Sequence, residues 1–264
     1  EEQRLTARRK DVGASPLNLW TSQGFVAREI LLPLSIWTPE TMREQLYTVT
    51  RECTQFKASI ARSIYLRFNA TRILDFSAGW GDRLIGALSL PNQIQRYIAF
   101  DPNTSLQDGH TAMIDRFAGD DPQRHLKYRV FYEPFEADQT FVSSETFDLV
   151  FTSPPFFDFE TYTENSEGQS IVSFPTFESW LNNFLFASLA KAWTQLDEGG
   201  HMVIHINDCG GQKICQRMCT FIVNKLPGSN YVGMLGVAGT LSSCPRPTWV
   251  FHKQSQARKR TRRS

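Results

Sequence analysis

The sequence predicts an α/β fold with a doubly wound, mostly parallel sheet of seven strands and an antiparallel strand pair at its C-terminal end. Three observations support this prediction. From residue 72 onward, short β-rich runs alternate with helical or irregular stretches. The first five runs are apolar on both faces, as parallel strands covered by helices on each side require. The last two runs follow each other with only a turn-prone segment between them.

Two helices are expected before the first strand. The first covers residues 38–56, where Thr38 can cap the helix and Pro39 suits its first position. The second covers residues 56–68, in which apolar residues recur at helical spacing.

The strands and the longest helix follow from the same patterns. The expected parallel strands are residues 72–77, 96–101, 128–133, 147–152 and 201–207, and the expected antiparallel pair is 231–238 and 248–253. The longest expected helix begins at the capping residue Thr176 and carries an apolar stripe from Trp180 to Trp193, interpreted as core. Gly199 and Gly200 are expected to stop it.

The chain is expected to form one domain with two irregular ends. Residues 36–252 contain no internal repeat or low-complexity linker. Residues 1–35 form an N-terminal arm without an assigned role, and residues 253–264 form a basic tail that is expected to be disordered. Without the six basic residues of this tail, 22 basic residues remain against 27 acidic ones. The tail can contact phosphate, serve as a nuclear address or remain a solvated end.

Composition favours a globular protein inside the cell. Of the 264 residues, 41% are hydrophobic and 21% are charged, which fits a chain with a substantial core. No apolar run reaches the roughly 18 to 20 residues of a membrane span, and the first residues lack the apolar centre of a signal peptide. We expect no membrane partner, and a location in the nucleus of a eukaryote or in the cytoplasm or nucleoid otherwise.

The cysteines do not predict a metal centre. Cys53, Cys209, Cys215, Cys219 and Cys244 form no C-x-x-C pair, and their odd number argues against a closed disulfide framework. We interpret them as buried or unreactive thiols and expect no metal ligand among them.

Candidate site residues follow the strands, because ligands of open α/β sheets bind beyond the carboxyl ends of the strands. The first strand runs into DFSAGWGD, where Gly79 and Gly81 let the backbone approach a ligand closely. The second ends in FDPN, which places Asp101 about 20 residues beyond the glycine turn, where an acidic side chain suits ribose hydroxyls. An Asx turn with Pro102 and Asn103 is the alternative explanation of Asp101.

The fourth strand runs directly into TSPPF, residues 152–156. Pro154 and Pro155 lack a backbone N–H and fix φ, so they end the strand in a rigid corner. In their order along the chain, DFSAGWG, FDPN and TSPPF resemble the class I S-adenosylmethionine-dependent methyltransferases. Within that family they resemble the branch that methylates exocyclic amino groups of nucleic-acid bases.

The resemblance covers residues 55–252 and implies a Rossmann-like methyltransferase fold with S-adenosylmethionine as cofactor. It places Lys57 near the methionine end of the cofactor. The third strand ends in EPFEAD, which can set Phe135 or Glu136 beside an adenine. The positions that it assigns to cofactor binding are Lys57, Asp75, Ser77, Ala78, Gly79, Trp80, Gly81, Asp101, Pro102, Asn103, Phe135 and Thr152.

The resemblance also implies catalytic roles for Ser153, Pro154, Pro155 and Phe156. The lone pair of an exocyclic amine is delocalised into the base ring, so the nitrogen is a poor nucleophile until hydrogen bonds draw it toward tetrahedral geometry. Ser153 Oγ and the Pro154 carbonyl can accept two such bonds at one rigid corner. Phe156 can stack on the base, and a base in a duplex must first be flipped out.

The sequence is compatible with more than one methyl acceptor. A serine-first corner is more typical of cytosine-N4 enzymes, so cytosine N4 in DNA is the first candidate and adenine N6 in DNA or RNA is the second. Many cytosine-N4 enzymes, however, have the two motif blocks in the opposite order. Protein-glutamine methylation and an inactive nucleic-acid-binding module are further alternatives. A nicotinamide dehydrogenase shares the glycine turn but gives no reason for the two prolines.

The loop of residues 157–173 is the candidate segment for contacting a target strand, because loops of this length usually serve as lids or binding loops. The oligomeric state is left open, and a homodimer or a partner subunit can supply sequence recognition. The residues expected to contact nucleic acid are Phe157, Tyr162, Arg246, Arg258, Lys259 and Arg260.

Overall fold

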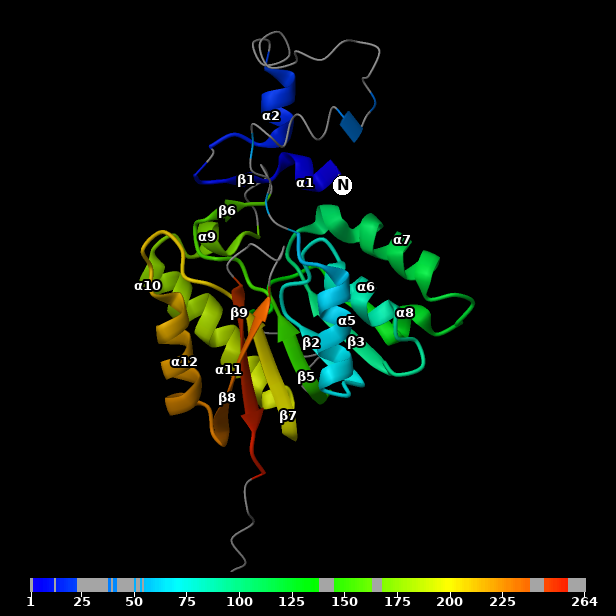
Figure 1. Cartoon of the computed structure of the whole chain (residues 1–264), viewed down its shortest axis with the longest axis vertical. Helices are drawn as coiled ribbons and strands as arrows, with labels where there is room; N and C mark the ends of the chain where they lie inside the picture. Colours follow the sequence, from blue (N-terminus) through cyan, green and yellow to red (C-terminus); the bar gives the residue numbers. More distant parts are fainter. Residues whose placement is uncertain are drawn as a thin grey trace, which may run out of the picture.

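The computed structural model describes residues 2–11, 13–22, 38, 40–41, 50, 53, 55–137, 145–162, 168–237 and 245–255 (Figure 1). None of the helices formed by these residues has the length and apolar character that a membrane crossing requires. The predictions that lie outside the described residues concern most of the helix 38–56, part of the loop 157–173, Cys244, and the tail residues Arg258, Lys259 and Arg260.

A seven-stranded sheet forms the centre of the described chain, in the order β4-β3-β2-β5-β7-β9-β8. Neighbouring strands from β4 to β7 are parallel, whereas β9 is antiparallel to both β7 and β8. The predicted fold class is therefore confirmed. The strands are β2 (Arg72–Asp75), β3 (Arg96–Phe100), β4 (Tyr128–Phe131), β5 (Phe147–Thr152), β7 (Leu196–His205), β8 (Ser229–Val237) and β9 (Arg246–Lys253).

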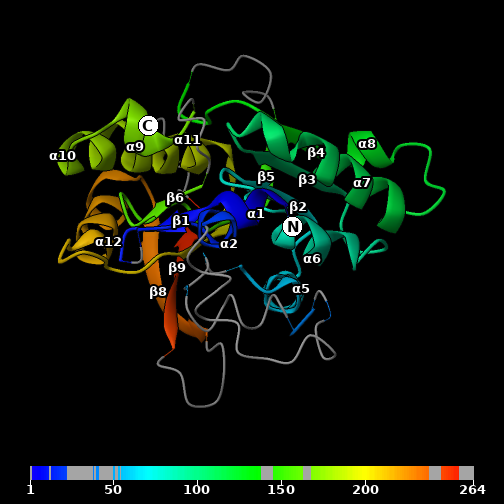
Figure 2. The same ribbon diagram turned by 90° about the horizontal axis from the view of Figure 1, so that it is seen from above.

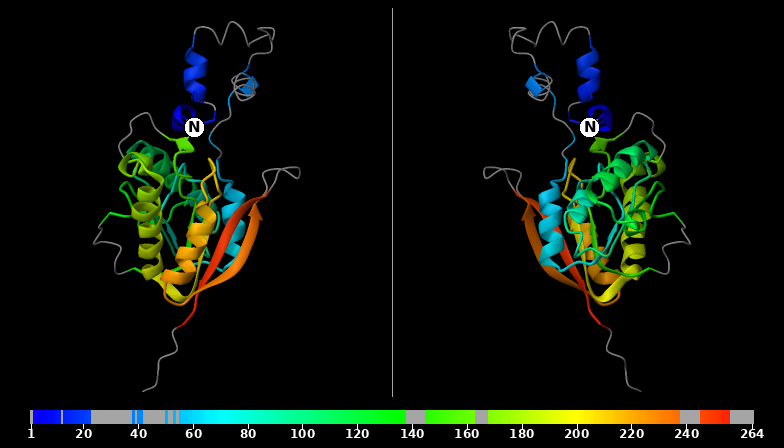
Figure 3. Two further views of the ribbon diagram at one scale, coloured as in Figure 1. Left: turned by 90° about the vertical axis from the view of Figure 1, so that its left-hand side faces the viewer. Right: turned by 90° about the vertical axis from the view of Figure 1, so that its right-hand side faces the viewer.

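Helices cover both faces of this sheet (Figures 2 and 3). One face is covered by α5 (Ala58–Arg67), α6 (Asp82–Leu88) and α7 (Gln107–Phe117), and the other by α10 (Phe177–Ser179), η4 (Trp180–Phe186), α11 (Ala187–Gln195) and α12 (Ile214–Lys225). Successive strand residues point to opposite faces, so Ile73 packs with the first group and Leu74 with the second. Shorter helices are η2 (Thr104–Leu106), α8 (Arg124–Lys127) and α9 (Ser170–Ser173).

The longest predicted helix ends earlier than expected. Thr176 caps it, as predicted, by accepting a backbone hydrogen bond of 3.2 Å. Helical structure then continues through α10, η4 and α11 to Gln195, and Leu196 already pairs with β5. The prediction that Gly199 and Gly200 stop the helix is wrong, because both lie within β7, where the register against β5 shifts.

The apolar stripe of this helix belongs to the core, as predicted. Trp180, Leu185 and Leu189 have no exposed surface, and Trp193 is 1% exposed. The segment η4 has π-helical hydrogen bonding, a conformation that is rare and occurs mostly as single turns inside α-helices.

The N-terminal residues pack on the segment that follows β5. The two-residue strand β1 (Arg8–Arg9) pairs antiparallel with β6 (Glu160–Thr161), which follows the proline corner (Figure 1). Lys10 N–H donates to the Phe159 carbonyl at 2.9 Å, and the Lys10 ammonium pairs with Asp158. The elements concerned are α1 (Glu2–Thr6), β1 (Arg8–Arg9), α2 (Pro16–Thr21) and β6 (Glu160–Thr161).

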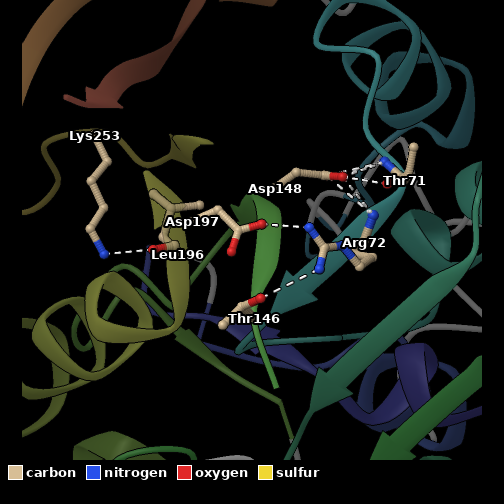
Figure 4. A network of polar contacts seen from close by, with 7 residues as sticks. All are labelled: Thr71, Arg72, Thr146, Asp148, Leu196, Asp197 and Lys253. Atoms are coloured by element: carbon tan, nitrogen blue, oxygen red, sulfur yellow. Dashed lines mark hydrogen bonds and ion pairs between the residues drawn. The ribbon is translucent and has the colours of Figure 1, made fainter. Parts of the chain in front are cut away.

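A polar network joins the strands at the edge of the sheet opposite the strand carboxyl ends (Figure 4). Asp148 accepts hydrogen bonds from the backbone N–H groups of Thr71 and Arg72, at 3.0 and 3.1 Å. The Arg72 guanidinium pairs with Asp197 at 2.5 Å. Lys253 Nζ donates to the Leu196 carbonyl at 2.5 Å. Strands β2, β5, β7 and β9 are thereby held in register at this edge.

We expect Asp148→Ala to lower the free energy of unfolding by about 1–3 kcal/mol, because two partly buried backbone donors lose their acceptor. Asp197→Ala is the control, since its partner Arg72 is 40% exposed and such pairs contribute about 1 kcal/mol or less. Urea unfolding measures both. Equal effects of the two substitutions would contradict the role given to Asp148.

Candidate active site

A cavity of about 480 Å³ lies at the carboxyl ends of the parallel strands. The segments that follow β2, β3, β4, β5 and β7 line it, together with the residues just ahead of α5. This is the position at which ligands bind in open α/β sheets. The sequence-predicted residues that line it are Lys57, Ser77, Ala78, Gly79, Trp80, Asp101, Pro102, Asn103, Phe135, Ser153, Pro154, Pro155, Phe156, Phe157, Tyr162 and Arg246.

Three predicted cofactor residues, Asp75, Gly81 and Thr152, do not line the cavity. Asp75 is fully buried and accepts hydrogen bonds from Arg83 Nε at 2.7 Å and from the Tyr97 hydroxyl at 2.9 Å. Thr152 is fully buried at the end of β5. Asp75 and Thr152 are buried parts of the fold, and their positions do not support the direct ligand contacts that were predicted for them.

Gly81 is required by packing and backbone conformation. Its φ of +91° lies in the left-handed region, where side chains are strained. A Cβ there would lie 2.7 Å from Met113 Sδ and 3.0 Å from His110 Cδ2. Gly81 therefore lets α7 pack closely against the start of α6.

The glycine turn is held by the end of the neighbouring strand. Gly79 has a φ of +58°, and its N–H donates to Asp101 Oδ2 at 2.8 Å. Asp101 Oδ1 accepts from the Asn103 N–H at 3.0 Å, which is the Asx turn considered from the sequence. Burial raises the pKa of Asp101 to about 6. Asp101 thus closes two turns while its carboxylate lines the cavity.

Two charged residues at the start of α6 line the cavity and were not predicted. Asp82 accepts a hydrogen bond from Gln55 Nε2 at 2.9 Å, and burial raises the pKa of Asp82 to about 6. Arg83 pairs with the buried Asp75 and places its guanidinium 5.7 Å from the ring centre of Phe56. Both directly follow the glycine turn in the sequence, which is the signal that could have identified them.

The proline corner is held by a cysteine from the loop after β7. Cys209 Sγ donates to the Phe156 carbonyl at 3.0 Å. Burial raises the pKa of Cys209 to about 11, so the thiol keeps its proton at neutral pH. Cys209, Asn207 and Asp208 all line the cavity, and none was predicted. The rule that ligands collect after each strand applies equally to this loop and could have found it.

Phe157 lies largely in the core. It is 8% exposed and packs edge-on against Phe177 and Trp180, with ring centres 5.3 and 5.6 Å away. Its φ of +53° is unusual for a residue other than glycine. The predicted contact of Phe157 with a nucleic-acid strand is therefore not supported by its position.

Tyr162 lies on the cavity wall. Its hydroxyl donates to Glu160 at 2.7 Å, and its ring lies edge-on to Trp80, with the ring centres 5.8 Å apart. Burial raises the pKa of Tyr162 well above its ordinary value, so the hydroxyl remains a donor. Glu160 belongs to β6, so the N-terminal strand β1 supports this wall.

Comparison with models of protein families and with curated protein sequences gives no significant match. Among solved structures, the chain is similar to an rRNA methylase from Streptococcus thermophilus (TM-score 0.50, 10% identity), over 77% of this chain and 99% of that one. It is also similar to TrmN from Thermus thermophilus (TM-score 0.50, 13% identity), over 74% of this chain and 48% of that one. Identities this low establish the fold alone. The chain has a Rossmann-like methyltransferase fold.

We expect Gly79→Ala to lower stability by about 1–2 kcal/mol through backbone strain and to weaken binding of S-adenosylhomocysteine. A Cβ at Gly79 meets no atom within 4 Å and would occupy open space where Gly79 lines the cavity. Gly109→Ala is the control, because Gly109 lies in α7 with similar free space and no positive φ. Calorimetry that finds equal affinity in both variants would contradict a ligand at this turn.

Proposed function

We propose that the protein is an S-adenosylmethionine-dependent enzyme that methylates the exocyclic amino group of a nucleic-acid base, with cytosine N4 in DNA as the first candidate. One observation carries this proposal. The glycine turn with Asp101 and the Ser153–Phe156 corner line the same cavity, although they lie far apart in the sequence. In this proposal, the site for the methyl donor adjoins the hydrogen-bond acceptors that bind the planar amine.

The residues present fit S-adenosylmethionine. Gly79 leaves its backbone open to close approach, and Asp101 retains a lone pair on each carboxylate oxygen for a ribose hydroxyl. Phe135, stacked on Phe76 with ring centres 5.5 Å apart, supplies an apolar wall for the adenine. Lys57, at the start of α5, is assigned to the methionine end. When bound, the cofactor supplies a methyl group on a positively charged sulfur.

The corner would bind and orient the amine. Ser153 Oγ and the Pro154 carbonyl accept hydrogen bonds from the two amine protons, which returns lone-pair density to the nitrogen and directs it toward the cofactor. Pro154 and Pro155 keep the two acceptors at a fixed spacing. Phe156, packed against the core cluster, holds the base by stacking.

Adenine N6 in DNA or RNA is the second candidate, because the corner presents acceptors to any planar amine. The fold neighbour from Streptococcus thermophilus is described as an rRNA methylase, which favours testing RNA beside DNA. Arg246 lines the cavity from β9 and is proposed to contact the phosphate or the base of the target. The alternatives of a protein glutamine substrate or an inactive binding module make different predictions in the same assay.

The test is incubation of the protein with S-adenosylmethionine and either mixed DNA and RNA or a mixture of proteins, followed by mass spectrometry of the nucleosides and of the peptides. We expect N4-methylcytosine, and N6-methyladenine if the second candidate holds. Methylated glutamine in protein substrates, or no methylated product with any substrate, would overturn the proposal.

Ser153→Ala should lower kcat by about 10²- to 10³-fold, the usual loss when one positioned hydrogen-bond group is removed from a transition state. The affinity for S-adenosylhomocysteine should not change. Ser170→Ala is the matched control, because Ser170 lines the same cavity and its hydroxyl accepts a hydrogen bond from Trp180 Nε1 at 3.1 Å instead. If Ser153→Ala retained full activity, the hydroxyl would have no role in transfer.

Cys209→Ala should lower the single-turnover rate several-fold at saturating cofactor, because the Phe156 carbonyl loses its donor and the corner loses a restraint. Cys209→Ser replaces the S–H donor with an O–H donor and should restore most of the rate. Identical rates in the two variants would show that this hydrogen bond does not position the corner.

A further inference from the structure

His110 of α7 contacts the glycine turn from outside the cavity. It is 1% exposed, and its Nε2 lies 2.9 Å from the Gly79 carbonyl oxygen. Its Nδ1 lies 3.1 Å from the Tyr132 hydroxyl, and the two rings are stacked at an interplanar angle of 19°. His110 does not line the cavity. Its polar atoms are therefore directed at the turn and at Tyr132.

The chemistry of the partners fixes the direction of each hydrogen bond. The Gly79 carbonyl can only accept, so His110 Nε2 must carry the proton. Burial lowers the pKa of His110, so the ring is neutral and Nδ1 accepts from the Tyr132 hydroxyl. Burial raises the pKa of Tyr132 to about 12, so this hydroxyl keeps its proton. The Gly79 carbonyl therefore selects the tautomer, and the Tyr132 hydroxyl holds the ring by donating to Nδ1.

Both polar groups of Gly79 are thus held by one neighbouring unit of the fold. The Gly79 N–H donates to Asp101 at the end of β3, and its carbonyl accepts from His110 of α7, the helix that follows β3. A glycine with positive φ has no side chain to restrain it and has access to many backbone conformations. Two hydrogen bonds from a packed helix and strand end reduce that freedom.

We propose that His110 is a positioning residue for the cofactor site: together with Asp101 it fixes the peptide of Gly79 in the orientation that receives the cofactor, and Tyr132 holds the His110 ring in place through its hydrogen bond to Nδ1. This inference rests on the proposed function, because it assumes that the turn binds S-adenosylmethionine. It assigns a role to two residues that the sequence motifs did not include. It is consistent with the close packing of α7 on Gly81, where a Cβ would lie 2.7 Å from Met113 Sδ and 3.0 Å from His110 Cδ2.

The test measures the dissociation constant of S-adenosylhomocysteine by calorimetry in a matched pair of variants. His110→Leu removes the donor at similar volume and should weaken binding on the order of tenfold, because a held carbonyl is left without its partner. His110→Gln places an amide N–H near the position of Nε2 and should restore affinity to within about threefold of the unsubstituted protein. For both variants, kcat at saturating cofactor should stay near that of the unsubstituted protein.

Ile114→Val is the control for general loosening of α7, since Ile114 is buried on the same helix and does not line the cavity. It should lower the melting temperature without changing the dissociation constant. If His110→Leu does not fold, Tyr132→Phe replaces it, and an unchanged dissociation constant in that variant would overturn the proposal. Equal dissociation constants of S-adenosylhomocysteine for His110→Leu and the unsubstituted protein would also overturn the proposal.

The experiment distinguishes failure of the proposed function from failure of the role proposed for His110. If the unsubstituted protein does not bind S-adenosylhomocysteine, the proposed function fails. If it binds, and the loss in His110→Leu is not restored in His110→Gln, the Nε2 hydrogen bond has no positioning role and only this inference fails.

Discussion

The buried pair of Asp75 and Arg83 is the interaction on which the candidate site depends. Both side chains are at most 5% exposed, and the pair links the end of β2 to the first turn of α6. Asp75 also accepts from the Ser77 N–H at 3.2 Å, and Arg83 donates to the Ser77 carbonyl. Burial of two charges is costly, and removal of one partner commonly destabilises a protein by about 3–5 kcal/mol. Replacement of a whole buried pair by packed apolar side chains is often neutral, so the main contribution of this pair is the defined turn.

The polar residues at the two ends of the parallel strands have different roles. At the edge formed by the strand amino ends, Asp148, Arg72 and Lys253 join strands through hydrogen bonds to backbone groups and neighbouring side chains. At the opposite edge, glycine turns, a proline corner and carboxylates with raised pKa values surround a cavity. Residues with perturbed pKa values inside a cleft are typical of functional sites. The edge at the strand carboxyl ends thus carries the buried carboxylates with raised pKa values, whereas the opposite edge joins the strands.

Local patterns predicted much of the fold, and long-range contacts account for what they missed. The parallel strands and Thr176 were predicted because periodicity and capping depend on neighbouring residues. The end of the long helix at Gln195 was missed, because pairing with β5 decides it. The pairing of β1 with β6 joins segments about 150 residues apart, and two-residue strands leave no periodic signal. The strand-end rule led to Asp101 and Ser153, which line the cavity, and it applies equally to the loop of Cys209. The contact of His110 with Gly79 lies outside the cavity and leaves no local motif.

The most direct test of the proposed cofactor site is a crystal structure of the protein with S-adenosylhomocysteine. We expect a ribose hydroxyl within hydrogen-bonding distance of the Asp101 carboxylate, and the sulfur atom directed at the Ser153 hydroxyl and the Pro154 carbonyl. A ligand bound elsewhere, or one whose sulfur is directed away from the proline corner, would contradict the proposed transfer of a methyl group to a base amine.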